Sequence, residues 1–189
     1  MSKYVSCLLG LLITVPVFAA ESVFSLDASH SSIGFSVRHM GITNVRGQFG
    51  EFDGSIRMGE DIESLSFEAV IQASSVDTNN EGRDDHLRNE DFFEVETFPV
   101  ITFKSTGIEK SDEDHVLVGE LTMKETTREV RLPITVSGPA EDPWGNTRIG
   151  LHIGGSIERH DYGVGFAGAS DRLIGNTVTF DINLQAIEQ

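Results

Sequence analysis

The densest cluster of side chains that could do chemistry runs from Arg83 to Arg88, with the sequence Arg-Asp-Asp-His-Leu-Arg. Arg83, His86 and Arg88 could meet the polar headgroup of a ligand, since the planar fork of a guanidinium suits phosphate oxygens. The favoured alternative is a capped helix whose arginines pair with neighbouring carboxylates, because charged helical stretches are usually solvated. The spacing of the aspartates and His86 matches no metal signature, so we expect no metal site.

Histidines are the other candidates for acid–base chemistry, but they are scattered along the chain. Catalysis requires a nucleophile, a base and an orienting group that converge, and the chain has no Gly-x-Ser-x-Gly motif. We therefore predict no catalytic residue and no enzymatic activity; a lipid hydrolase or isomerase that uses His39 or His86 is the alternative. His39 could face a ligand headgroup at the end of a strand, or it could be an ordinary hydrogen-bonded strand-end histidine.

Apolar and polar residues alternate along the segments that would position these side chains. In the clearest case, Val178, Phe180, Ile182 and Leu184 are separated by polar residues. Such alternation predicts strands with one dry and one wet face, which is typical of antiparallel sheets. Comparable runs occupy residues 33–37, 65–71, 115–121, 130–136 and 149–153.

Turn signals between these runs, such as Asp53-Gly54 and Gly138-Pro139, divide the chain into eight to ten predicted strands. Closing the sheet into a barrel would remove its exposed edges, and a sandwich is the competing solution. The rhythm breaks between Ser75 and Pro99, where Asp77 or Thr78 could cap a short helical segment near residues 81–92.

The N-terminus has the order of features of a secretory signal peptide. Lys3 precedes an apolar run of twelve residues, Cys7 to Phe18, and Ala19 and Ala20 follow. We predict a cleaved signal peptide over residues 1–19, with the cut after Ala19 or Ala20, and a single mature domain over residues 20–189. The mature domain would lack cysteine, because Cys7 is the chain's only one.

The acidic balance limits the possible partners. The formal net charge is −16, and it becomes −17 when Lys3 is removed with the signal peptide. At long range this charge repels nucleic acid and anionic membrane surfaces. No segment of the mature chain has the length and composition of a stable membrane insertion.

Four segments together resemble the YceI-like family of bacterial periplasmic lipid-binding proteins. The segments are Leu26–Gly54, Ser75–Thr106, Gly119–Leu132 and Asp142–Gly163. The most specific string is SVDTNNEGRDDHLRNEDFF in the second segment. The resemblance implies a lipocalin-like β-barrel in the periplasm that encloses an elongated apolar cavity.

The resemblance also implies the ligand: a long-chain isoprenoid, quinone-like or polyprenyl, or a similar fatty-acid-like lipid, with no other cofactor. The net charge argues for a neutral head over a diphosphate. His39, Arg83, His86 and Arg88 are the headgroup candidates. The candidates for the cavity lining are the inward-facing apolar residues Ile33, Phe35, Val37, Phe49, Phe67, Ile71, Phe103, Leu121, Leu132, Ile134, Phe180 and Ile182.

Two alternatives to a lipid carrier stay open at this point. Small barrels can fill themselves with side chains, so a ligand-free structural or stress-protective protein fits the same alternation. The enzyme described above is the weaker alternative. Residual strand edges could also pair two copies into a homodimer.

Overall fold

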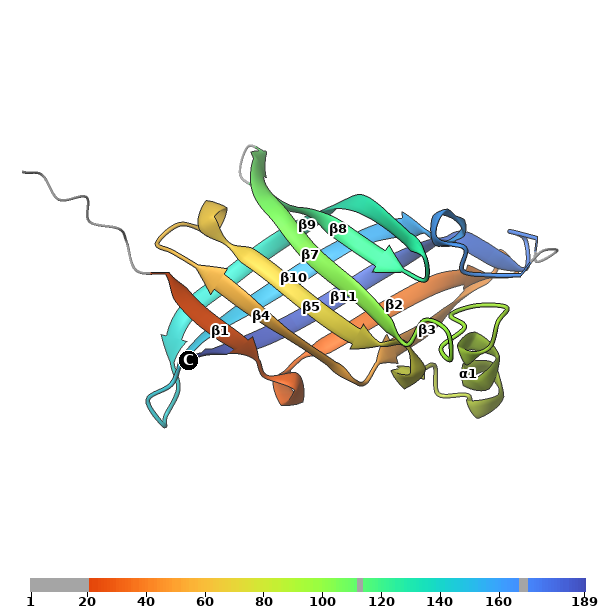
Figure 1. Cartoon of the computed structure of the whole chain (residues 1–189), viewed down its shortest axis with the longest axis horizontal. Coiled ribbons are helices and arrows are strands. Elements are labelled where there is room, and N and C mark those ends of the chain that lie inside the picture. Colours follow the sequence, from red (N-terminus) through yellow and green to blue (C-terminus); the bar gives the residue numbers. More distant parts are fainter. Residues whose placement is uncertain (1–20, 112–113, 167–169) are drawn as a thin grey trace, which may run out of the picture.

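The computed structural model describes residues 21–111, 114–166 and 170–189, which form an antiparallel β-barrel with a short α-helix at one end (Figure 1). The predicted signal peptide lies outside the described residues. The helix is α1 (Glu81–Arg88). The strands are β1 (Ser22–Leu26), β2 (Ser32–His39), β3 (Thr43–Phe49), β4 (Phe52–Met58), β5 (Ser66–Gln72), β6 (Val76–Asp77), β7 (Val100–Ser111), β8 (Asp114–Met123), β9 (Thr126–Glu141), β10 (Thr147–Glu158) and β11 (Ile174–Glu188).

The barrel is a ring in which each strand position pairs with the next along the chain. β1 and β2 both run beside β11, so together they occupy one position. β3 with β4, and β5 with β6, form the next two positions. β7 to β11 follow in order, which closes an 8-stranded ring. The predicted all-β antiparallel barrel of eight to ten strands with one short helical segment is confirmed.

The interior is apolar because every strand turns its alternate apolar side chains inward. The most completely buried large side chains include Ile56, Leu117, Ile149 and Ile153, from β4, β8 and β10. Each such burial stabilises the fold by about 1.5–3 kcal/mol relative to exposure. None of these four side chains lines the cavity described below.

Helix α1 is fixed to the barrel by polar contacts around Thr78. Asn80, and not Asp77 or Thr78 as predicted, caps the helix, because its side chain accepts from the Arg83 amide at 2.9 Å. Buried Asp84 instead accepts from the amide and hydroxyl of Thr78. Burial raises the pKa of Asp84, but the hydrogen bonds from Thr78 and Asn80 and the charge of Arg88 together hold the pKa below its usual value. The helix thus folds back onto the strand that precedes it.

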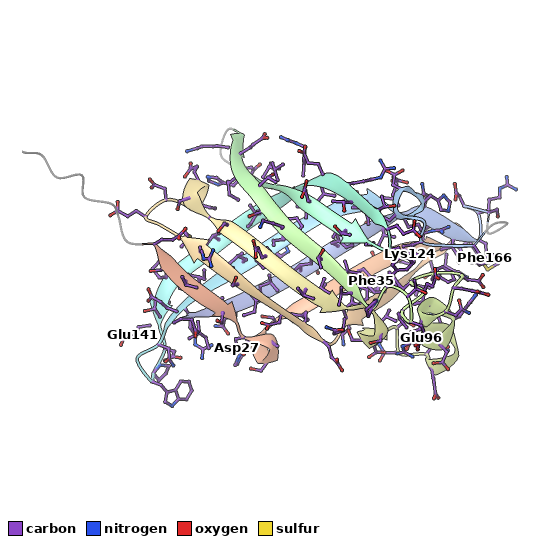
Figure 2. All side chains as sticks on the ribbon, in the orientation of Figure 1. Asp27, Phe35, Glu96, Lys124, Glu141 and Phe166 are labelled. Carbon is purple, nitrogen blue, oxygen red and sulfur yellow. The ribbon has the colours of Figure 1, made fainter. Side chains whose placement is uncertain are left out.

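An ion-pair cluster lies at the opposite end of the barrel. Figure 2 labels Asp27 and Glu141 at this end, and Phe166 and Glu96 at the helix end. Arg148 donates to Asp27 and to Asp142, each at 2.7 Å. Hydrogen bonds from Ser29 and Arg148 hold the pKa of Asp27 well below its usual range, and hydrogen bonds from Asn146 and Arg148 do the same for Asp142. The cluster joins the start of the barrel to the β9–β10 hairpin.

Candidate ligand-binding cavity

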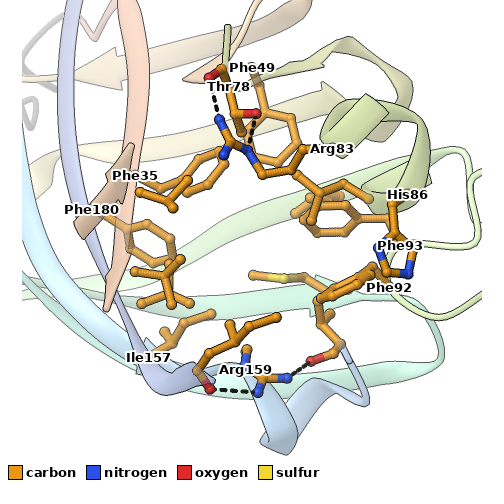
Figure 3. Close-up of a pocket in the computed structure, with 18 of the residues that line it drawn as sticks. Phe35, Phe49, Thr78, Arg83, His86, Phe92, Phe93, Ile157, Arg159 and Phe180 are labelled. Atoms are coloured by element: carbon orange, nitrogen blue, oxygen red, sulfur yellow. Dashed lines mark hydrogen bonds between the residues drawn. The ribbon is translucent and has the colours of Figure 1, made fainter. Parts of the chain in front are cut away.

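A cavity of about 240 Å³ opens at the helix end of the barrel (Figure 3). It lies between the end of β2, the start of β11, the end of β10, and the segment of α1 and the turns that follow it. Most of the lining side chains are hydrocarbon. The apolar lining residues are Phe35, Val37, Val45, Phe49, Leu87, Phe92, Phe93, Ile101, Met123, Ile157, Val164, Ile174, Val178 and Phe180, and the polar ones are His39, Thr78, Arg83, His86 and Arg159.

Aromatic side chains form one wall of the cavity. The ring centroids of Phe35 and Phe49 are 5.6 Å apart, and Phe49 stands the same distance from Phe93 in an edge-on arrangement. These spacings are within the favourable range for aromatic pairs. Gly47, opposite Phe35 on the neighbouring strand, leaves room for this ring, because a Cβ there would lie 2.5 Å from Phe35 Cζ.

Arg83 places a guanidinium at the edge of this apolar space. Its Nε donates to the Thr78 hydroxyl at 2.7 Å, and its Nη2 donates to the Thr78 carbonyl at 2.8 Å. No ion pair between the described residues includes Arg83. Its remaining N–H donors are therefore available to a ligand atom at the cavity wall.

Arg159, on the opposite wall in Figure 3, is only 4% exposed. It donates to the backbone carbonyls of Gly175, Val164 and Ile174 at 2.8–3.0 Å. Burial lowers the pKa of its guanidinium, and the charge of Asp171 partly offsets this. A buried cation that donates to three backbone carbonyls places positive potential beside the cavity.

His86 lies between aromatic rings at the cavity mouth. Its ring centroid is 5.0 Å from that of Phe92 and 5.9 Å from that of Phe166. Its Nε2 lies 2.9 Å from a carboxylate oxygen of Asp91. The imidazole therefore has a polar partner on the solvent side and apolar neighbours on the cavity side.

The structure brings some of the predicted site residues together and separates others. Of the predicted lining, Phe35, Val37, Phe49 and Phe180 line the cavity, and so do the headgroup candidates His39, Arg83 and His86. Arg88 does not; it donates to the carbonyls of Ser74 and Val76 and pairs with Asp85 at 3.0 Å. The remaining predicted residues pack in the core away from this cavity: Ile33, Phe67, Ile71, Phe103, Leu121, Leu132, Ile134 and Ile182.

Several lining residues escaped the sequence reasoning. Arg159 is the most informative, because it continues the inward parity of Ile149, Leu151, Ile153 and Ile157 along β10 and into the turn. Following that parity past the last apolar residue would have placed an arginine inside the barrel. Phe92 and Phe93, in the turn after α1, also line the cavity and are absent from the predicted lining.

The described residues contain no group of three or more His, Cys, Asp or Glu side chains arranged to hold a metal ion. No helix in the described ranges has the length and apolar character needed to cross a bilayer.

A closed antiparallel barrel with an apolar internal cavity defines the class of small lipocalin-like barrels. This chain belongs to the YceI-like domain family, whose model matches residues 24–186. It is 36% identical over 164 residues to a UPF0312 protein of Yersinia enterocolitica, covering 83% of this chain and 85% of that one. It is 37% identical over 147 residues to a UPF0312 protein of Pectobacterium carotovorum, covering 77% of each. No enzymatic activity is named among these relatives.

Solved structures share the fold. BcnA of Burkholderia cenocepacia superposes with a TM-score of 0.77 at 20% identity, covering 85% of this chain and 98% of that one. The Campylobacter jejuni YCEI protein superposes with a TM-score of 0.72 at 27% identity, covering 80% of this chain and 90% of that one. A Saccharophagus degradans domain superposes with a TM-score of 0.68 at 19% identity, covering 91% of this chain and 100% of that one. That domain is described as polyisoprenoid binding and implicated in plant cell wall breakdown.

Proposed function

We propose that this protein is a periplasmic carrier that holds the apolar tail of an isoprenoid or similar amphiphilic lipid in the barrel and catalyses no reaction. The observation that carries the proposal is the cavity itself: an opening of about 240 Å³ lined almost entirely by hydrocarbon. Ligand pockets combine such apolar walls with a few placed polar groups. The order of charge, apolar run and small residues at the N-terminus supports export.

The volume of the cavity limits how much of a tail it holds. At about 15 Å³ per water-sized group, about 240 Å³ accommodates about sixteen methylene or methyl groups. This corresponds to about three isoprene units or a common fatty-acyl chain. A longer polyprenyl chain would therefore leave part of its length outside the mouth.

The polar lining residues support a position for the head among them. Arg83, His86 and His39 line the cavity among otherwise apolar side chains, and Arg159 adds a buried positive charge. Arginine donates but does not accept hydrogen bonds, so a head rich in acceptor oxygens fits this rim. A quinone carbonyl, an amide or a carboxylate satisfies that requirement, and the overall negative charge still disfavours a diphosphate.

The description of the Saccharophagus domain as polyisoprenoid binding supports this ligand class. Identity to that domain is 19%, so the similarity establishes the fold alone. The ligand proposed for this chain rests on the chain's own cavity.

Mass spectrometry of lipid extracted from the native, exported protein tests the proposal. We expect one amphiphile class in roughly equimolar amount. Val178→Phe, which partly fills the cavity from β11, should retain less of the lipid, while Thr179→Phe on the outer face of the same strand should retain as much as the wild type. An empty wild-type protein that also binds no added isoprenoid or fatty acid would instead support the ligand-free structural alternative.

A further inference from the structure

We propose that the tip of the β2–β3 hairpin docks the cavity mouth onto an anionic lipid bilayer. Three large apolar side chains stand in solvent there: Met40 is 57% exposed, Ile42 76% and Leu173 42%. They form one edge, because the Met40 amide donates to the Leu173 carbonyl at 2.9 Å. Exposed apolar side chains that gather at one place mark an interaction site.

The backbone conformation at the tip of the hairpin is unfavourable for a methionine at position 40. Met40 and Gly41 are the two central residues of the turn, with φ values of 53° and 70°, and the Ile42 amide donates to the His39 carbonyl. Such turns favour Asn-Gly, because a side chain with a bulky Cβ substituent is strained at positive φ. A strained and exposed methionine therefore points to a role for its side chain outside the fold.

The charge around the tip complements an anionic surface. Although the chain has 30 acidic residues, none lies between residues 28 and 50. Arg38 and Arg46 occupy the hairpin, and Arg172 precedes Leu173. None of the three belongs to an ion pair in the part of the chain that the structure describes. At about 0.1 M salt the Debye length is about 10 Å, so a nearby bilayer responds to this rim more than to the net charge.

The other side of the mouth fixes the orientation. Helix α1 and the turn after it carry exposed carboxylates, including Glu81, Asp85 and Glu90. Asp171 sits beside Arg172, but it faces His160 at 3.8 Å. An anionic surface attracts the hairpin side and repels the helix side, so the barrel would tilt with β2 and β3 toward the lipid.

The hairpin tip is continuous with the cavity. His39, Val45 and Ile174 line the cavity, and His39 and Ile174 directly adjoin Met40 and Leu173 in the chain. Docking at this edge would place the cavity opening against the lipid, so an apolar tail would cross little water. Membrane docking is a property separate from lipid carriage, and vesicle binding measures it without knowledge of the cargo.

Co-sedimentation compares vesicles of phosphatidylcholine with vesicles of equal parts phosphatidylcholine and phosphatidylglycerol. We expect the wild-type protein to bind only the anionic vesicles, and to dissociate at about 1 M salt. Combining Arg38→Gln with Arg46→Gln should weaken binding about 25-fold, at about fivefold per cation. Combining Met40→Asn with Ile42→Thr should weaken it about tenfold or more.

The matched controls lie far from the mouth. Arg57→Gln removes one cation from β4, and Trp144→Ser removes an 82% exposed aromatic from the β9–β10 turn at the other end of the barrel. Neither should weaken binding. Trp144 is the chain's only tryptophan, so its fluorescence should stay unchanged when vesicles bind. In a variant that combines Ile42→Trp with Trp144→Phe, the tryptophan emission should shift to shorter wavelengths when vesicles bind, and brominated lipid should quench it.

Three results would overturn the proposal. One is equal binding by the hairpin variants and the wild type. Another is a vesicle-dependent shift of Trp144, which would assign the opposite end to the membrane. The third is no binding to anionic vesicles at about 0.1 M salt, which would leave an acidic protein partner as the occupant of this edge.

Discussion

Lengthening the tail of a bound amphiphile one carbon at a time should strengthen binding until the cavity is full and then have little further effect. The cavity volume of about 240 Å³ corresponds to about sixteen buried carbons. Each carbon removed from water contributes about 0.8 kcal/mol, or about fourfold in Kd, before torsional freedom is lost. We therefore expect an observed gain of about two- to fourfold per carbon below the limit.

A competition assay measures this dependence. Straight-chain alcohols of about eight to about twenty-four carbons, delivered from cyclodextrin, would displace a fluorescent fatty-acid probe from delipidated protein. The logarithm of Kd should fall linearly and then level near about sixteen carbons. A steady fall to the longest alcohol would refute the reasoning, because the barrel would then hold far more chain than its cavity allows.

Filling the cavity moves the expected break by a known amount. Val178→Phe adds about four carbons to a lining position, so the break should move to about twelve carbons. Thr179→Phe adds a similar volume to the outer face of β11 and should leave the break unchanged. Equal behaviour of the two variants would show that the tail does not occupy the space beside Val178.

Three further predictions concern stability and the shape of the cavity. Arg148 helps hold the pKa values of Asp27 and Asp142 below their usual range, so the wild type should lose stability as the pH falls below about 3.9. In urea unfolding, Arg148→Met should lower the stability at neutral pH and make the stability depend less on acid pH. Gly47→Ala should push the Phe35 ring toward the cavity, cost about 1–3 kcal/mol and shorten the preferred tail, whereas Gly154→Ala, with open space around its Cβ, should do neither. Met40→Asn should raise the free energy of unfolding by about 0.5–1 kcal/mol, since it relieves the positive-φ strain at the hairpin tip.

The barrel could be predicted from the sequence because a strand with one dry face leaves an unmistakable alternation. Runs such as residues 178–184 identify the inward side chains without any knowledge of neighbouring strands. The capping residue of α1 could not be chosen in the same way. Thr78 and Asn80 both have side chains that can cap, and the choice depends on the buried partnership of Thr78 with Asp84.

The position of the cavity could not be predicted, because parity does not distinguish a side chain that meets another from one that faces open space. Phe35 and Phe67 have the same parity in similar strands, yet Phe35 lines the cavity and Phe67 packs in the core against Phe103. The difference arises from the register around the ring, which places Phe35 at the end covered by α1. Register is set by long-range pairing and is not readable from one strand.

The hollow end is costly to the fold, which argues that it is kept for a ligand. If a volume of about 240 Å³ stayed empty and dry, it would cost at most about 6 kcal/mol at about 24 cal/mol per Å³. This is comparable with the whole net stability of a typical domain, about 5–15 kcal/mol. Larger apolar side chains at Val37, Val45 or Val178 would reduce that volume without burying a polar group. A barrel selected for stability alone would have filled this space, as its other inward positions are filled by Ile56, Leu117 and Ile149.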